Sequence, residues 1–205
     1  MLAIIDYGVG NLFSLKSSLE AIGIDAFVTG DINEIKNAER LILPGVGAFG
    51  DAAQKLRDCG LSDVITDEAK NGKFILGICL GMQLLFEKSF EYGEHNGLGI
   101  IEGEVRPISD VIPKNLKIPH IGWNKLDFKN GGSELFKYIK NGDFVYFVHS
   151  YYAANCEKNI IAAAEYGAEL TAAVAKENVF GCQFHPEKSG TVGLNILKAF
   201  CEMKY

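Results

Sequence analysis

Phe74-Ile-Leu-Gly77-Ile-Cys79-Leu-Gly81-Met-Gln83 places one cysteine between two glycines at the end of an apolar run. The run 74–78 predicts a buried strand, and residues 82–86 are expected to open a helix shortly after the cysteine. A strand, a sharp turn carrying the nucleophile and a helix form a nucleophile elbow, here with Cys in the place of Ser. Glycine permits the strained turn, and the positive end of a helix lowers the pKa of a thiol. Cys79 is therefore the candidate nucleophile, and simple packing of a buried cysteine is the alternative.

Outward from this segment, short apolar strands alternate with amphipathic helices through the first half of the chain. That alternation predicts a parallel sheet covered on both faces. The second half has short strands with little helix between them, which predicts an antiparallel extension of the same sheet before a closing helix. The fold class is therefore α/β, a three-layer sandwich with a central mixed, mostly parallel sheet, in a single domain over residues 1–205. The predicted strands are 2–5, 26–28, 41–43, 74–78, 100–105, 117–122, 144–148, 160–164, 171–175 and 179–184, and the predicted helices are 12–22, 51–58, 61–70 and 192–203.

A second chemical segment, Gly181-Cys-Gln-Phe-His185-Pro-Glu187, ends the last predicted strand. In an extended chain, residues two apart project to the same side, and Pro186 biases His185 away from helical backbone angles. A carboxylate beside an imidazole can fix its tautomer and hold it toward a nucleophile. Taken alone, a histidine and a glutamate at this spacing would more often be a solvent-exposed pair in a loop. Beside Cys79, at the same edge of the sheet, it predicts a base and its orienting acid.

A third segment, Leu43-Pro-Gly-Val-Gly-Ala-Phe-Gly50, matches the spacing of a dinucleotide-binding fingerprint. Two features weaken that match, because Pro44 stiffens the turn and the fingerprint usually opens the first strand and not the third. A glycine-rich turn can instead direct backbone N–H groups at a developing oxyanion. A ligand-free turn between strand and helix is the third possibility. Together with Cys79, His185 and Glu187, the loop favours a cysteine-dependent acyl-transfer enzyme.

Composition excludes several other classes of protein. The formal net charge of −6 argues against a nucleic-acid groove, and the longest apolar stretch is too short to span a bilayer. The first residues lack the basic region and cleavage site of a signal peptide. Five cysteines form an odd set with no Cys-x-x-Cys pair, so reduced thiols and a cytoplasmic location are expected. No metal ligand set is visible, and no metal or cofactor is expected.

The elbow Gly77-Ile-Cys-Leu-Gly-Met-Gln83 and the His185-Pro-Glu187 segment resemble the two signatures of the class I glutamine amidotransferases, which have a flavodoxin-like fold. More narrowly, the chain resembles the glutaminase subunits of imidazole glycerol phosphate synthases, from histidine biosynthesis. The narrower resemblance rests on segments spread over nearly the whole chain. These are Asp6-Tyr-Gly-Val-Gly-Asn11, Leu43-Pro-Gly-Val-Gly47, Pro119-His-Ile-Gly-Trp-Asn124, Phe147-Val-His-Ser-Tyr151 and Phe184-His-Pro-Glu-Lys188.

The resemblance implies a catalytic triad of Cys79, His185 and Glu187 that hydrolyses glutamine through a γ-glutamyl thioester. It also implies an ammonia-accepting partner, a (β/α)8-barrel cyclase subunit, that regulates this site. Because glycines flank Val46 on both sides, we hypothesise that the 44–47 loop flips an amide and serves as one physical switch. The remaining roles fall into three groups. The implied oxyanion hole is Val46 and Leu80; the implied glutamine contacts are Gly47, Gln83, Ser150 and Tyr151; the implied partner face is Asn11, Pro119, His120, Trp123, Tyr146 and Lys188.

Four other interpretations remain open at this point. The nearest is a glutaminase subunit serving another acceptor, such as pyridoxal phosphate synthase, against which the Gly122-Trp-Asn124 segment speaks. A catalytically dead α/β binding module conflicts with an intact triad. A nucleotide-binding oxidoreductase rests only on the glycines of the third segment. A cysteine peptidase or γ-glutamyl hydrolase would share the triad but act without a partner.

Overall fold

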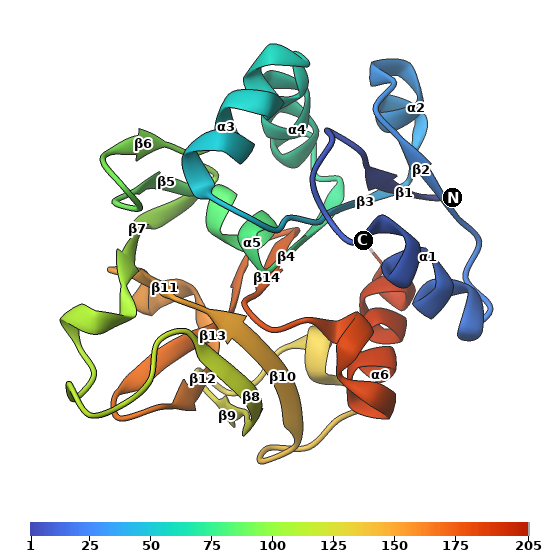
Figure 1. Ribbon diagram of the computed structural model, residues 1–205. Coiled ribbons are helices and arrows are strands. Elements are labelled where there is room, and N and C mark those ends of the chain that lie inside the picture. Colours follow the sequence, from blue (N-terminus) through green and yellow to red (C-terminus); the bar gives the residue numbers. More distant parts are fainter. Residues whose placement is uncertain (205) are drawn as a thin grey trace.

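An eight-stranded sheet forms the middle layer of the computed structural model, which describes residues 1–204 (Figure 1). Its strands run in the order β2-β1-β3-β4-β14-β13-β12-β9. The first five are mutually parallel, and the last three add antiparallel to β14 and to one another. The bounds are β1 (Leu2–Ile5), β2 (Ala26–Thr29), β3 (Arg40–Leu43), β4 (Phe74–Ile78), β9 (Asp127–Phe128), β12 (Ile160–Glu165), β13 (Glu169–Lys176) and β14 (Val179–Cys182).

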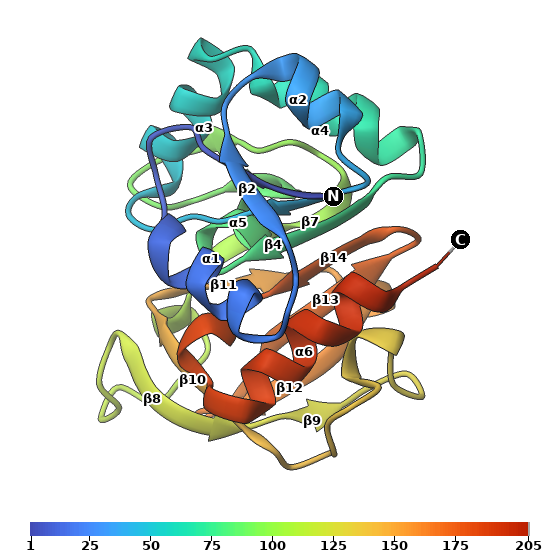
Figure 2. The same cartoon turned by 90° about the vertical axis from the view of Figure 1, so that its right-hand side faces the viewer.

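Helices cover both faces of this sheet, because its central strands are apolar on both sides. Alternate residues of β1 divide between two cores: Leu2 and Ile4 pack on one face, and Ala3 and Ile5 on the other. The first face carries α1 (Leu12–Ala21) and α6 (Gly190–Glu202), and the second carries α2 (Ile32–Asn37), α3 (Phe49–Asp58) and α4 (Leu61–Lys70). Figure 2 shows the three layers edge-on. No helix of the described chain is long and apolar enough to cross a membrane.

The predicted antiparallel extension is right for β13 and β12 and wrong for the other four strands predicted in the second half. β14, placed with them in the second half, pairs parallel with β4 in the middle of the sheet. The segments predicted at 100–105, 117–122 and 144–148 leave the central sheet and build two smaller ones. One has the order β11-β7-β5-β6 and the other pairs β10 with β8. Their bounds are β5 (Phe86–Ser89), β6 (His95–Asn96), β7 (Ile101–Pro107), β8 (His120–Lys125), β10 (Phe144–His149) and β11 (Tyr151–Ala154).

The helix after the elbow is shorter than its sequence pattern indicates. It begins at Leu80, two residues before the predicted opening, and α5 (Leu80–Leu84) ends before Phe86, which starts β5 and is fully buried. Residues 82–86 are all buried in the core. A buried helix and a buried strand both give a continuous apolar run, so the periodicity of the sequence could not show where the helix ends and the strand begins. Short 3-10 turns occupy Ile108–Asp110, Glu134–Phe136, Glu157–Asn159 and Pro186–Lys188.

Parallel strands bring the chemical segments to one edge. Since β1, β3, β4 and β14 run in the same direction, their carboxyl ends meet there. Pro44 follows β3, Cys79 follows β4, and Gln183 follows β14. This edge is where a binding site is expected in an open α/β sheet.

Candidate active site

Cys79 lies in the turn between β4 and α5 with a strained backbone. Its φ is 55° and its ψ is −113°, a region that non-glycine residues rarely occupy. A Cβ on Gly81 would lie 1.8 Å from the carbonyl oxygen of Leu43, and one on Gly77 would lie 2.7 Å from that of Gly81. Only glycine fits at both positions, so the sequence of the elbow is dictated by how closely its backbone folds on itself.

His185 and Glu187 form a buried pair just beyond the end of β14. The Nδ1–H of His185 donates to Glu187 Oε1 at 2.8 Å, and the two side chains are 3 % and 4 % exposed. That bond fixes Nδ1 as the donor, which leaves Nε2 for the nucleophile. Glu187 Oε2 is buried without a hydrogen-bond partner in residues 1–204, so His185 carries most of the interaction with this carboxylate.

The electrostatics of the site favour a protonated imidazole next to the thiol. Burial lowers the pKa of His185, but hydrogen bonds and charge attraction from Cys79 and Glu187 outweigh it and raise that pKa to about 9. An imidazolium beside Cys79 stabilises the thiolate form of the nucleophile and is ready to protonate a leaving group.

The 44–47 loop lies directly over the elbow. Tyr7 donates its hydroxyl proton to the carbonyl of Pro44 at 2.8 Å, and burial, followed by the charge of Cys79, raises the Tyr7 pKa, so the hydroxyl remains a donor. A Cβ on Gly45 would lie 2.8 Å from the amide nitrogen of Gly81, so only a glycine allows this approach. The loop thereby brings the Val46 backbone beside the first turn of α5, whose leading N–H groups have no intrahelical acceptor.

A cleft of about 310 Å³ opens above Cys79 and His185. Every residue predicted for the oxyanion hole and for glutamine contacts lines it, namely Val46, Leu80, Gly47, Gln83, Ser150 and Tyr151. Pro119 and Lys188, predicted for the partner face, line it as well. The fold therefore joins segments as far apart in the sequence as Val46 and Lys188 into one concave site large enough for an amino acid.

Sequence reasoning missed Glu91 and His149, which also line the cleft. Glu91 Oε2 accepts a hydrogen bond from the backbone N–H of Phe49 at 2.6 Å, and burial raises the Glu91 pKa against that bond. It is the one carboxylate among the lining residues of the described chain, in a stretch, 87–97, that carries no recognisable motif.

His149 belongs to a chain of hydrogen bonds that leads away from the cleft. Its Nδ1 lies 2.8 Å from the carbonyl of Tyr151, and its Nε2 lies 3.1 Å from His120 Nδ1. Burial lowers the pKa of both imidazoles to about 4, so both are neutral near pH 7. Because a carbonyl only accepts, His149 carries its proton on Nδ1, and His120 Nδ1 donates to His149 Nε2.

The predicted partner residues divide into exposed and buried ones. Trp123 on β8 is 54 % exposed, and its ring meets that of Tyr146 on β10 edge-on at 6.2 Å. Lys188 Nζ lies 5.9 Å from the Tyr146 ring centre, and Asn11 caps α1 by accepting from the Ser14 N–H at 3.4 Å. His120 is only 3 % exposed, so its side chain supports the β8–β10 pair from beneath.

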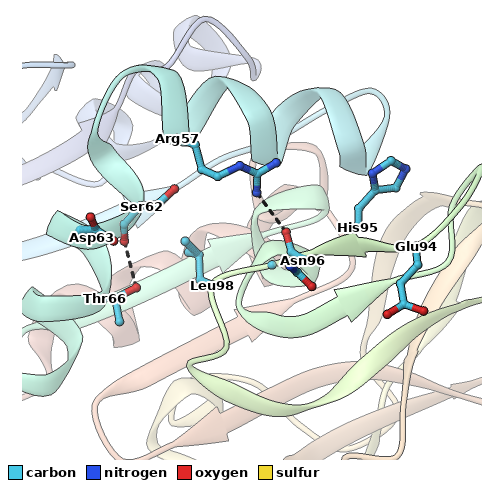
Figure 3. Close-up of a pocket in the computed structure, with 9 residues that line it drawn as sticks. Arg57, Ser62, Asp63, Thr66, Glu94, His95, Asn96 and Leu98 are labelled. Carbon is cyan, nitrogen blue, oxygen red and sulfur yellow. Dashed lines mark hydrogen bonds between the residues drawn. The ribbon is translucent and has the colours of Figure 1, made fainter.

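A second hollow, of about 460 Å³, lies away from Cys79 between α3, α4 and β6 (Figure 3). Arg57, its one lining Lys or Arg in the part of the chain that is described, already donates to the Asn96 carbonyl and to Gln54. Gly50, the third glycine of the possible dinucleotide fingerprint, lies against His95, whose ring would be 2.8 Å from a Cβ there. Close packing against His95 therefore explains why position 50 is a glycine, and the dinucleotide-binding interpretation loses its support.

The thiol on its elbow, the imidazole held by a carboxylate and the cleft above them form the arrangement expected of a cysteine-dependent amide-cleaving or acyl-transfer enzyme. The family model for class-I glutamine amidotransferases matches residues 3–203. The chain belongs to the class I glutamine amidotransferase family.

Its curated relatives specify the branch of that family. The chain is 55 % identical over 204 residues to the imidazole glycerol phosphate synthase subunit HisH of Caldanaerobacter subterraneus subsp. tengcongensis, covering 99 % of this chain and 98 % of that protein. It is 48 % identical to the HisH subunits of Bacillus subtilis (99 % and 96 % covered) and Aquifex aeolicus (96 % and 94 %).

Solved structures support the fold. A glutamine amidotransferase crystal structure superposes with a TM-score of 0.75 at 19 % identity, covering 98 % of this chain and 97 % of that one. The structure of PurLQS from Thermotoga maritima gives a TM-score of 0.73 at 21 % identity, covering 98 % and 96 %. These matches confirm the α/β architecture with its central, mostly parallel sheet.

Proposed function

We propose that the chain is the glutaminase subunit of an imidazole glycerol phosphate synthase, which hydrolyses glutamine and delivers ammonia to a cyclase subunit. The observation that carries this is the buried His185–Glu187 pair beside a thiol on an intact elbow. The HisH relatives, matched over nearly their full length, are the basis for proposing which reaction uses the ammonia.

In the proposed reaction, the Cys79 thiolate attacks the side-chain amide carbon of glutamine. The oxygen of the tetrahedral intermediate would receive hydrogen bonds from the backbone N–H groups of Leu80 and Val46. His185 gives its Nε2 proton to the departing ammonia, leaving a γ-glutamyl thioester. His185 then takes a proton from water, and the resulting hydroxide attack releases glutamate and regenerates the thiolate. Glu187 keeps the imidazole oriented throughout.

The cleft offers complementary groups to the amino-acid end of glutamine. Gln83, Ser150, Tyr151 and the backbone at Gly47 would lie along the substrate. Glu91 is the acceptor available to its α-ammonium group, since the Phe49 N–H satisfies only one of the two carboxylate oxygens. That contact would select an amino acid over a simple amide.

The proposed partner is a (β/α)8-barrel cyclase that binds over the outer face of the β8–β10 pair. Trp123 lies opposite Tyr146 in the register, and exposed Ile121 lies opposite Val148, which lines the cleft. This apolar face is therefore continuous with the mouth of the active site. Ammonia passing to the cyclase would react with a ribulosyl phosphate intermediate, giving imidazole glycerol phosphate and an aminoimidazole carboxamide ribotide. The free chain is expected to be nearly silent.

The test is glutamate release from glutamine by the purified chain, alone and with its cyclase partner and a ribulosyl ligand. Wild type and Cys79→Ala are compared. Strong stimulation by the partner that disappears in Cys79→Ala is the expected result. Full activity without the partner would indicate a free-standing hydrolase, and no activity in any mixture would overturn the proposal.

A further inference from the structure

Gln183 lies next to the nucleophile and has no role in the mechanism above. It follows β14 directly and is fully buried, with its backbone N–H donating to the Ala172 carbonyl at 2.8 Å. In the parallel pairing, Cys182 of β14 stands opposite Ile78 of β4, so the next residues along the two strands are Gln183 and Cys79. The side-chain Nε2 of Gln183 lies 3.8 Å from Cys79 Sγ.

The orientation of this amide is fixed by a chain of hydrogen bonds behind it. Gln83 has its Nε2 3.2 Å from the Tyr151 carbonyl, which can only accept, so the atom there must be the amide nitrogen. The same Nε2 lies 2.9 Å from Gln183 Oε1, which must therefore be an acceptor. The other end of the Gln183 amide, its NH₂ group, then faces the sulfur.

An amide NH₂ group donates and cannot accept. Of the forms that Cys79 passes through, the thiolate is the strongest acceptor for it, because charge strengthens a hydrogen bond and a thioester sulfur carries no charge. Gln183 and His185 both lie just beyond the end of β14, where the chain bends, and both side chains reach the sulfur of Cys79 from this one segment.

We propose that Gln183 is a second stabiliser of the nucleophile: its side-chain N–H, oriented by Gln83, donates to Cys79 Sγ and favours the thiolate. This rests on the proposed function in that Cys79 is taken as the nucleophile toward glutamine. Gln183 thereby favours both the attacking thiolate and its departure when water cleaves the thioester. Its effect belongs to the chemical step and not to substrate binding.

The experiment measures the rate of Cys79 alkylation by iodoacetamide against pH, with the modified peptide quantified by mass spectrometry. Gln183→Glu keeps an oxygen for Gln83 but removes the N–H donor, and Gln183→Met removes both. Thr171→Val is the matched control, because Thr171 on the neighbouring β13 is 5 % exposed and donates to the Ala153 carbonyl at 2.7 Å. Thermal melts followed by circular dichroism identify which variants are folded.

Gln183→Met is expected to shift the alkylation midpoint upward by about one pH unit, the size of a hydrogen bond to a charged group. Gln183→Glu is expected to shift it further, because its carboxylate also repels the thiolate. With the cyclase complex, kcat for glutamine falls about tenfold while KM stays near the wild-type value. An unchanged alkylation profile in a folded Gln183 variant overturns the inference, as does an equal shift in Thr171→Val. Alkylation needs no glutamine, so a shifted profile in a complex that cannot hydrolyse glutamine would contradict only the proposed function.

Discussion

At the scale of single residues, the pairing of His185 with Glu187 couples catalysis to the charge state of the imidazole. In the unfolded chain the pKa of a histidine is near 6.5. In the folded protein burial lowers the pKa of His185, but the interactions with Cys79 and Glu187 outweigh it and raise the pKa to about 9. A group whose pKa is raised on folding stabilises the fold fully below its unfolded pKa. That stabilisation is lost as the pH rises through the folded pKa.

Glu187→Gln should therefore change how stability depends on pH. The variant keeps a side chain of the same shape but loses the negative charge that helps to hold the imidazolium. The free energy of unfolding of the wild type relative to this variant is expected to be constant below about pH 6.5 and to decrease toward pH 9 and above. Urea unfolding at a series of pH values, followed by circular dichroism, measures it. A difference that stays flat from pH 6 to pH 10 would contradict the assigned pairing.

Individual residues also show which features local sequence determines. The sharp turn at Cys79 could be predicted because its geometry depends on neighbours within two positions, Gly77 and Gly81. Glu91 could not, because its place in the cleft depends on the N–H of Phe49, 42 residues away. Gln183 lay inside a recognised segment, yet its contact with the sulfur depends on the register between β4 and β14.

At the scale of elements, the β8–β10 pair has a polar interior that acid should disturb. His120 and His149 face each other across it, in the register that also pairs Trp123 with Tyr146. Burial lowers the pKa of His149 to about 4, below its unfolded value near 6.5. The unfolded chain therefore binds the proton first, and stability is lost as the pH falls from about 6.5 to about 4.

His149→Gln tests this loss. Glutamine can still donate to the Tyr151 carbonyl but does not titrate, so the variant should lose less stability on acidification. Relative to the variant, the wild type is expected to lose about 1.4 kcal/mol of unfolding free energy per pH unit between pH 6 and pH 4.5. Denaturant titrations of the two proteins at matched pH give the comparison. Parallel pH profiles would show that His149 is charged in the folded protein, contrary to its burial.

Helices and strands, like single residues, could be predicted where local sequence determines them and were missed where distant partners do. Helix α4 was predicted over its full length, because an amphipathic helix carries its own periodicity. Strands β5, β6, β9 and β11 were missed, since two of them have only two residues and all are defined by their partners. The split of the second half into separate sheets likewise follows from long-range pairing that no local pattern records.

At the scale of the whole molecule, the active site and the proposed partner face are one continuous surface. Ile121 and Trp123 alternate outward on β8 while His120 points into the core, so β8 has one side toward the His120–His149 hydrogen bond and the other toward solvent. The exposed fractions of 58 % and 54 % for Ile121 and Trp123 are high for large apolar side chains near a cleft. A cyclase covering this face would contact the strand that carries the His120–His149 bond.

Trp123→Ala should accordingly weaken the complex without damaging the subunit. Truncating a central interface tryptophan typically costs about 2 kcal/mol or more, which raises the Kd of the cyclase complex roughly thirtyfold. Val28→Ala is the control, because Val28 is 36 % exposed on β2, the strand at the opposite end of the sheet from β9. Titration calorimetry gives Kd, and glutamate release at saturating cyclase shows whether the site survives. Equal Kd values for the two variants would place the partner elsewhere. A Trp123→Ala subunit that regains full activity at saturating cyclase would show that this ring provides affinity and is not itself needed to activate the site.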